Sequence, residues 1–475
     1  MDKTPEIRLE LLSSDLEAIV GKGNVSISIF DRISYALDPM PYDLAPEEIP
    51  YAVVKPSSAE EVSEILKYAN KHKIPVWVHG SGTALHGATR PKCKCIVLST
   101  SRMKDVKIYE DHGYFECGPG VRVEELSDIL EKRGYFLPLM PGSRPVATVG
   151  GGIAVNTSGH LVDSCIGKPS DYVLGLQVVL PTGEIIETGT KALRRPAGID
   201  LTRIFVGSEG VLGVITKVRM RLIPKPNEEA QGVAFFKGCL PIARAVVRMY
   251  VERTPPPIFT EFMDEKCVEI SFSSQGLQYP EESAVVMVRT MGYMPGEAKW
   301  KLKCIFNAFK KENPIEIRVV EDEHEWKQIW ACREVVGSLI TQKRGPAITG
   351  EIVPALPKLP DAMRDVMELP KKMKTVKNPE MYLYGHIGAP TIHLQLIVPT
   401  ELTDEERKKF VKEVWEKTEA LNIKYGGVGG EWGVTRYRIE FLKEKYGETY
   451  YNILLGLKKL LDPNNILNPG NLEGW

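Results

Sequence analysis

Two histidines lie in a stretch that can bring their side chains to one place. The stretch MYLYGHIGAPTIHLQLIV, residues 381–398, predicts two strands joined at Gly-Ala-Pro. Along one straight strand His386 and His393 would point to opposite sides, whereas a turn between them allows the two imidazoles to meet. Neutral imidazoles are common ligands of divalent metals. The alternative is that both histidines only satisfy hydrogen bonds in a core.

An acidic residue further along the chain can complete a metal site. Glu431 stands in Gly429-Gly-Glu-Trp-Gly433, where the glycines allow the backbone to come close to a ligand. With the two histidines it would give three ligands for zinc or manganese and leave one position open for a substrate. Its neighbour is Trp432, whose indole has one donor and no basic nitrogen, so this side chain cannot accept a proton.

Three loops of small residues form a second group of candidates, at residues 80–87 (GSGTALHG), 141–159 and 200–215. The first follows an expected strand, where backbone amides can converge on a phosphate. It is not a GxGxxG turn and lacks the lysine of a Walker loop, so taken alone it also fits a tight turn. Three such loops on one α/β domain favour an extended dinucleotide over a single phosphate.

The elements around the first loop follow from capping and periodicity. Ser58 and Glu61 form a capping box, and an apolar stripe follows at helical spacing. Residues 74–78 then predict a short buried strand that leads into the loop. Residues 171–189, DYVLGLQVVLPTGEIIETG, predict two strands joined by a Pro-Thr-Gly turn.

A polar, proline-bearing segment at residues 221–232 predicts a domain boundary. Beyond it, apolar strands alternate with helical patterns to about residue 425, and the C-terminal tail is helical. The fold class expected is therefore α+β. We expect domains at 1–225 and 226–430, with 431–475 as a C-terminal segment.

Composition favours a small-molecule ligand. The chain has 475 residues, and its 61 lysines and arginines nearly balance 62 aspartates and glutamates, which argues against nucleic acid as a partner. Neither a signal peptide nor a membrane span is expected, so we predict a cytoplasmic protein. The eight cysteines are scattered, and the CxC pair at Cys93 and Cys95 has no second pair, so reduced buried thiols are expected.

The order of four motifs resembles a known family. Gly80-Ser-Gly-Thr, Ala147-Thr-Val-Gly-Gly, Gly207-Ser-Glu-Gly and Asn468-Pro-Gly are similar to motifs of the FAD-linked oxidases of the vanillyl-alcohol-oxidase superfamily. The resemblance is closest to the glycolate oxidase D-subunit and to D-lactate and D-2-hydroxyglutarate dehydrogenases. It implies a PCMH-type FAD-binding domain of two subdomains, an α+β substrate (cap) domain, and a C-terminal segment that returns to the flavin site.

The resemblance also implies which residues contact the cofactor. The expected FAD-binding residues are His79, Gly80, Ser81, Gly82, Thr83, Ala84, His86, Gly87, Pro141, Gly142, Thr148, Gly150, Gly151, Asn156, Ser158, Gly159, Val214 and Asn468. Members of the family often carry arginine and serine where this chain has His79 and His86. Neither histidine matches the pattern of covalent flavin attachment, so non-covalent FAD is expected.

Metal-dependent members of the family share part of the histidine pattern. Gly385-His386, His393 and Gly430-Glu431 match their motifs, which implies zinc, manganese or iron at His386, His393 and Glu431. The segment between the histidines differs from the usual Gly-Asp-Gly-Asn, and Trp432 replaces the histidine expected as general base. Arg333 matches an arginine that holds the substrate carboxylate, with a surface ion pair to a nearby glutamate as the alternative.

These features predict an FAD-dependent dehydrogenase that oxidises a 2-hydroxy acid, with Arg333, Glu431 and Trp432 at the catalytic site. A protein acceptor is expected, namely an electron-transfer flavoprotein or an iron-sulfur subunit, because no second dinucleotide motif is present. We also consider a homodimer. Two alternatives are a metal-free oxidoreductase of an aromatic alcohol or phenol, and a non-catalytic FAD-bearing electron-transfer subunit.

Overall fold

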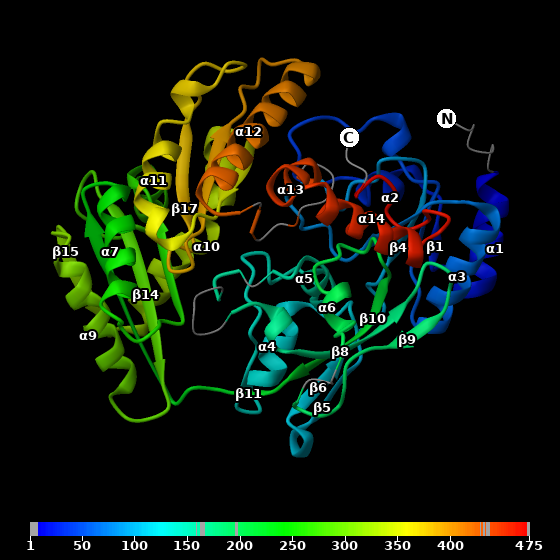
Figure 1. Cartoon of the computed structure of the whole chain (residues 1–475), viewed down its shortest axis with the longest axis horizontal. Coiled ribbons are helices and arrows are strands. Elements are labelled where there is room, and N and C mark those ends of the chain that lie inside the picture. Colours follow the sequence, from blue (N-terminus) through cyan, green and yellow to red (C-terminus); the bar gives the residue numbers. More distant parts are fainter. Residues whose placement is uncertain are drawn as a thin grey trace. The chain divides into compact units, whose positions relative to one another are not determined.

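The computed structural model describes residues 8–157, 159–161, 167–194, 198–427, 429–430, 433 and 438–472. The chain divides into two units, which are described separately (Figure 1). Unit 1 comprises Met1–Thr157, Lys168–Pro224 and Glu431–Trp475, and unit 2 comprises Ser158–Gly167 and Lys225–Gly430.

Helix α3 (Ala59–His72) begins where the capping residues predict. The Ser58 hydroxyl accepts the Glu61 backbone N–H at 3.2 Å, and the Val62, Ile65, Leu66 and Ala69 side chains are fully buried. Burying this stripe against the sheet removes apolar surface from water and fixes the helix there. The next element is strand β3 (Val76–His79), which delivers the chain to the first small-residue loop.

A four-stranded sheet forms the first half of unit 1, in the order β1-β2-β4-β3. Strands β2, β4 and β3 are parallel, and β1 is antiparallel to β2. The bounds of the other three strands are Val25–Ser26 for β1, Ala52–Val54 for β2 and Ile96–Ser99 for β4. The C-terminal segment also joins this sheet, because Leu467 forms a parallel bridge with Val76.

A five-stranded antiparallel sheet forms the second half of unit 1, in the order β5-β6-β10-β8-β9. The bounds are Val106–Tyr109 for β5, Tyr114–Cys117 for β6, Val214–Arg221 for β10, Val173–Val179 for β8 and Ile185–Glu187 for β9. The β8–β9 hairpin confirms the two strands predicted around the Pro-Thr-Gly turn. A small ladder pairs β7 (Tyr135–Phe136) with β11 (Ile223–Pro224).

Unit 1 contains further helices among its described residues. The α-helices are α1 (Leu9–Val20), α2 (Ile29–Ser34), α4 (Val123–Glu131), α5 (Val149–Val155), α6 (Thr202–Phe205), α13 (Ile439–Tyr446) and α14 (Glu448–Leu461). Short 3-10 helices lie at Pro46–Glu48, Glu110–His112 and Pro169–Asp171.

Unit 2 is built on a seven-stranded antiparallel sheet, in the order β15-β12-β14-β13-β17-β18-β16. The bounds are Glu316–Val320 for β15, Glu228–Phe236 for β12, Ala284–Gly292 for β14, Phe259–Met263 for β13, Met381–Gly385 for β17, Ile392–Ile397 for β18 and Ala347–Ile352 for β16. Strands β13, β17 and β18 lie next to one another, so side chains from distant parts of the chain meet there.

Helices pack along this sheet, with α9 against β12 and β14 and α12 against β16 (Figure 1). The α-helices are α7 (Cys239–Val251), α8 (Glu265–Phe272), α9 (Glu297–Lys310), α10 (Glu323–Arg344), α11 (Leu359–Met367) and α12 (Asp404–Tyr425). Short 3-10 helices lie at Ser273–Gln275, Leu356–Lys358 and Pro370–Lys372. Mixed helices and largely antiparallel sheets confirm the predicted α+β class. Among the described residues, none of the helices has the length and apolar character needed to cross a membrane.

Candidate functional site

A cleft in unit 1 is formed where the three small-residue loops come together. It is lined mostly by glycine, alanine, threonine and short apolar side chains from both halves of the unit. The lining residues are Val78, Gly80, Ala84, Ala88, Thr89, Thr100, Pro119, Gly150, Gly151, Ala154, Val155, Glu209, Gly210, Gly213 and Ile215. Such a lining offers backbone groups to a ligand, as a long nucleotide cofactor requires.

Glycine is required where the loops touch. A Cβ atom at Gly80 would lie 2.6 Å from Thr148 Oγ1, and one at Gly150 would lie 2.3 Å from Pro119 Cβ. Thr148 in turn caps α5 by accepting the Gly151 backbone N–H at 3.4 Å. A larger residue at either glycine would therefore push apart the loops that line the cleft.

The C-terminal motif joins two of these loops. Asn468 Oδ1 accepts the Val78 N–H and Asn468 Nδ2 donates to the Glu209 carbonyl, each at 2.9 Å. The backbone N–H of Asn468 also donates to the Val76 carbonyl at 2.9 Å. This buried amide therefore holds β3 next to the Gly207–Gly210 loop.

His79, the last residue of β3, and His86 of the first loop are both buried. His79 Nδ1 lies 3.2 Å from the Gly80 carbonyl, and its ring packs against Tyr35 with the centroids 4.9 Å apart. Burial lowers the pKa of His79 to about 4, so this imidazole is neutral near pH 7. His86 is 4% exposed.

The other predicted cofactor residues have varied positions. Gly82 and Gly87 have positive φ, Asn156 ends α5 in the left-handed conformation, and Val214 is buried in β10. Pro141 is buried and Gly142 exposed, while Gly159 belongs to unit 2 by its contacts, and Ser158 lies outside the described residues. Sequence reasoning missed Pro119 and Thr100, which line the cleft without a motif of their own.

In unit 2 the β17–β18 hairpin brings the two predicted histidines together. Tyr384 pairs with His393 in the ladder, and His386 follows the end of β17. The two imidazole rings meet edge to face with their centroids 5.0 Å apart, and both side chains are buried. Glu431 and Trp432 lie outside the described residues. Of the three predicted metal ligands, the structure therefore describes His386 and His393.

A buried glutamate on β13 contacts this hairpin. Glu261 Oε1 lies 2.6 Å from His386 Nδ1, a hydrogen-bond distance. Glu261 Oε2 accepts from Arg333 Nε at 2.8 Å and pairs with Arg333 Nη2 at 2.6 Å. Glu261 and Arg333 are 0% and 4% exposed. The arginine fork is therefore occupied by Glu261, which corresponds to the ion-pair alternative, although the pair is buried rather than on the surface.

A third histidine, which the sequence did not single out, completes the cluster. His160 is 3% exposed, and its Nδ1 lies 3.2 Å from Glu261 Oε1, although neither ring nitrogen makes a hydrogen bond with the described residues. Its ring meets Trp330 and His386 edge to face, with centroid distances of 4.8 and 5.2 Å. His160, Glu261 and His386 each offer a ligand atom, and these atoms lie within 4.8 Å of one another.

Burial and charge set the protonation of this cluster. Burial alone would raise the pKa of Glu261, but the Arg333 guanidinium, with help from His386 and His160, holds it well below its usual range. Burial lowers the pKa of His160 to about 4, despite the attraction of Glu261. At neutral pH the cluster therefore contains a carboxylate, a guanidinium and a neutral His160.

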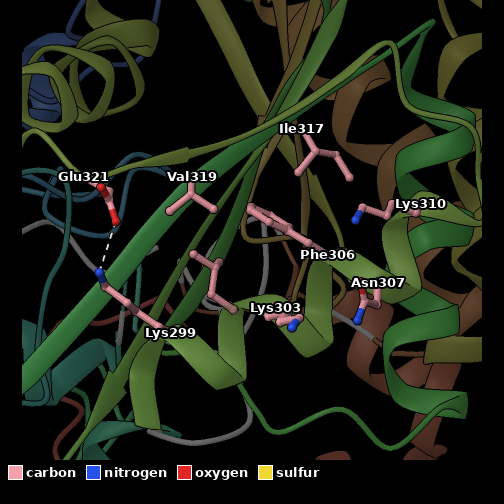
Figure 2. A pocket seen from close by; sticks show the side chains of 9 residues that line it. Lys299, Lys303, Phe306, Asn307, Lys310, Ile317, Val319 and Glu321 are labelled. Atoms are coloured by element: carbon pink, nitrogen blue, oxygen red, sulfur yellow. Dashed lines mark hydrogen bonds and ion pairs between the residues drawn. The ribbon is translucent and has the colours of Figure 1, made fainter. Parts of the chain in front are cut away.

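A second hollow in unit 2 lies between α9 and the edge strand β15 (Figure 2). Its volume is about 470 Å³, and its lining includes Phe306, Ile317 and three lysines, of which Lys299 pairs with Glu321 at 3.1 Å. It contains no histidine and none of the predicted site residues. Its groups do not suit hydride or metal chemistry, so we assign the functional site to the cleft and the buried cluster.

Two family models match consecutive parts of the chain. The FAD binding domain family matches residues 50–189, and the C-terminal domain family of FAD linked oxidases matches residues 225–472. The chain is 31% identical to a D-lactate dehydrogenase of Archaeoglobus fulgidus over 451 residues, which cover 92% of this chain and 95% of the relative. It is 27% identical to the glycolate oxidase subunit GlcD of Bacillus subtilis, over 97% of this chain and 96% of the relative.

Solved structures agree on the fold. The crystal structure of p-cresol methylhydroxylase with substrate bound aligns with a TM-score of 0.79 at 18% identity, covering 98% of this chain and 96% of that chain. At this identity the likeness concerns the fold alone. Together with the two family matches, it shows that the chain belongs to the FAD-linked oxidases and is a flavin-dependent oxidoreductase.

Proposed function

We propose that this chain oxidises a 2-hydroxy carboxylic acid to the 2-oxo acid and passes the electrons from FAD to a protein acceptor. The observation that carries the proposal is the buried cluster in unit 2, in which an arginine, a glutamate and histidines surround one point of the sheet. Relatives named as a D-lactate dehydrogenase and a glycolate oxidase subunit support this substrate class.

The cleft of unit 1 fits a dinucleotide, because backbone of three loops lines it and a Cβ at Gly80 or Gly150 would disturb those loops. We expect Gly80, Ala84, Gly150 and Gly151 to contact FAD, with Asn468 holding the loops in place. When bound, FAD accepts the hydride of the substrate. His79, which precedes the first loop, is neutral near pH 7 and so adds no positive charge beside the cleft.

The two buried imidazoles of the β17–β18 hairpin fit a divalent metal, with Glu431 as the third predicted ligand. Such a metal, when bound, lowers the pKa of a coordinated alcohol and so eases loss of its proton. This matters here because Trp432 replaces the expected base. The chain's own residues would hold the hydroxyl oxygen near His386 and His393 and exclude water by burial.

Arg333 supplies the positive charge for the substrate carboxylate. Its Nε already donates to Glu261 Oε2 and its Nη2 pairs with the same oxygen, so a carboxylate would meet Nη1 rather than a free fork. Glu261 therefore fixes the direction of the guanidinium. This geometry favours recognition of one carboxylate oxygen at this arginine.

We propose that a partner protein accepts the electrons from FAD. The seven cysteines of the described part of the chain are free thiols at scattered positions, so an iron-sulfur centre would belong to a partner. The proposed partner is an electron-transfer flavoprotein or an iron-sulfur subunit.

Product analysis tests the proposed reaction. The purified protein, mixed with D- or L-lactate, glycolate or 2-hydroxyglutarate and an artificial electron acceptor, is expected to form the matching 2-oxo acid, identified by mass spectrometry. Formation of an aldehyde from an aromatic alcohol, with no 2-oxo acid from any hydroxy acid, would instead support the alternative of aromatic substrates.

A further inference from the structure

His160 is a buried imidazole whose ring packs against Trp330 and His386. It is 3% exposed, and neither ring nitrogen makes a hydrogen bond with any part of the chain that the structure describes. Burying a polar group without a hydrogen bond costs free energy, so an orphaned buried imidazole indicates a ligand that is not protein. The nearest polar groups are those of the buried cluster.

The neighbours of His160 are themselves metal-binding types. Its Nδ1 lies 3.2 Å from Glu261 Oε1, which in turn lies 2.6 Å from His386 Nδ1. First-row divalent metals bind such nitrogen and oxygen ligands at about 2.0–2.2 Å, so neighbouring ligand atoms on one ion lie about 3 Å apart. The ligand atoms of His160, Glu261 and His386 all lie within 4.8 Å of one another, so the group would have to close on an ion to bind it.

We propose that His160, Glu261 and His386 bind a divalent cation directly. The inference rests on the proposed function, in which His386 is already a metal ligand, and it adds two donors that the sequence motifs do not include. His160 comes from the segment after α5 and Glu261 from β13, so the site ties this segment to the sheet of unit 2.

The charges around the group suit this assignment. Arg333 bonds to Oε2 of Glu261 and leaves Oε1 facing the two histidines, and ligating carboxylates are commonly held by such an outer hydrogen bond. Because Arg333 neutralises Glu261, a divalent cation would leave this buried site with a net positive charge. An anionic substrate such as a 2-hydroxy acid would offset that charge, which connects the cation to the proposed substrate class.

Metal affinity measured apart from turnover tests the inference. The FAD-loaded protein is stripped with a chelator and titrated with Mn²⁺, and free Mn²⁺ is counted by electron paramagnetic resonance. We expect the wild type to bind one Mn²⁺, and His160→Gln and Glu261→Gln to bind it at least about 10-fold more weakly. His324→Gln, at an exposed histidine of α10, is the matched control and is expected to bind as the wild type does.

Flavin content and melting temperature are measured on each variant, so that unfolding is not mistaken for loss of a ligand. If Glu261→Gln does not fold, His160→Gln decides, because His160 makes no hydrogen bond with the described residues that its loss would break. Unchanged Mn²⁺ affinity in His160→Gln would overturn the inference. If the wild type oxidises a hydroxy acid without binding metal, the inference fails while the proposed reaction stands.

Discussion

Single glycines shape the cleft of unit 1, where we propose that FAD binds. Gly80 lines the cleft and packs against Thr148, whose hydroxyl caps α5. The missing side chain allows the strand-to-loop junction after β3 to touch the start of α5. His79 is buried beside the same junction, and its imidazole remains neutral near pH 7.

Gly80→Ala is expected to lower FAD content several-fold. The added Cβ would lie 2.6 Å from Thr148 Oγ1, and relieving such overpacking costs about 1–3 kcal/mol. Flavin absorbance per chain after gel filtration measures the effect. Gly456→Ala is the control, because Gly456 lies in α14 with open space around its Cβ position, and this helical variant should keep full FAD content.

His79 should make the holoprotein less stable in acid. Its folded pKa of about 4 lies below the unfolded value of 6.5, so the unfolded state takes up the proton first as the pH falls. The contribution is present above pH 6.5 and is lost toward pH 4, at about 1.4 kcal/mol per pKa unit. Between about pH 7.5 and 5.5 the wild type should lose about 1 kcal/mol more than His79→Asn.

Urea titrations with excess FAD, followed by flavin fluorescence, measure that difference. Equal pH dependence in the wild type and His79→Asn would show that this imidazole does not remain neutral in the folded protein.

At the scale of elements, the sequence predicted those helices and hairpins whose signals lie close together in the chain. Helix α3, the β8–β9 hairpin and the β17–β18 hairpin all follow from capping, turn residues and alternation, because these signals lie within a few residues. Glu261 could not be placed opposite His386 in this way, since the two residues are 125 positions apart. A charged residue in the apolar run of β13 was a usable signal, because a buried carboxylate needs a partner.

The backbone at the end of β17 sets the direction of the His386 side chain. Gly385 has φ +151°, and a Cβ there would lie 2.4 Å from the Thr391 carbonyl oxygen. Gly385→Ala is therefore expected to displace His386, reducing turnover at least 10-fold and destabilising the hairpin by about 1–3 kcal/mol. Gly276→Ala, also at positive φ but with open space around it, controls for backbone strain. Equal turnover in the two variants would contradict this role.

At the scale of the whole molecule, the two units divide the proposed chemistry. Unit 1 contains the cleft that we propose for FAD, and unit 2 contains the buried cluster. The sequence motifs identified the loops of the cleft because they are contiguous runs of small residues. They did not identify His160, since a lone histidine carries no periodic signal and its partners come from β13 and the β17–β18 hairpin.

This division predicts that metal and flavin can be lost separately. His393→Ala should remove bound metal and most turnover, because it deletes a predicted ligand, while FAD stays bound at the wild-type level. Elemental analysis and flavin absorbance of the same sample measure both. Equal metal content in the variant and the wild type would remove His393 from the ligand set.

The central claim is that the flavin of this chain takes its electrons from a 2-hydroxy acid. Anaerobic mixing of the purified protein with a panel of D- and L-2-hydroxy acids, followed at the flavin absorption band, tests it most directly. We predict rapid bleaching by at least one member of the panel and no rapid reduction of NAD by the isolated chain. A flavin that chemical reductants bleach but every hydroxy acid leaves oxidised would contradict the account.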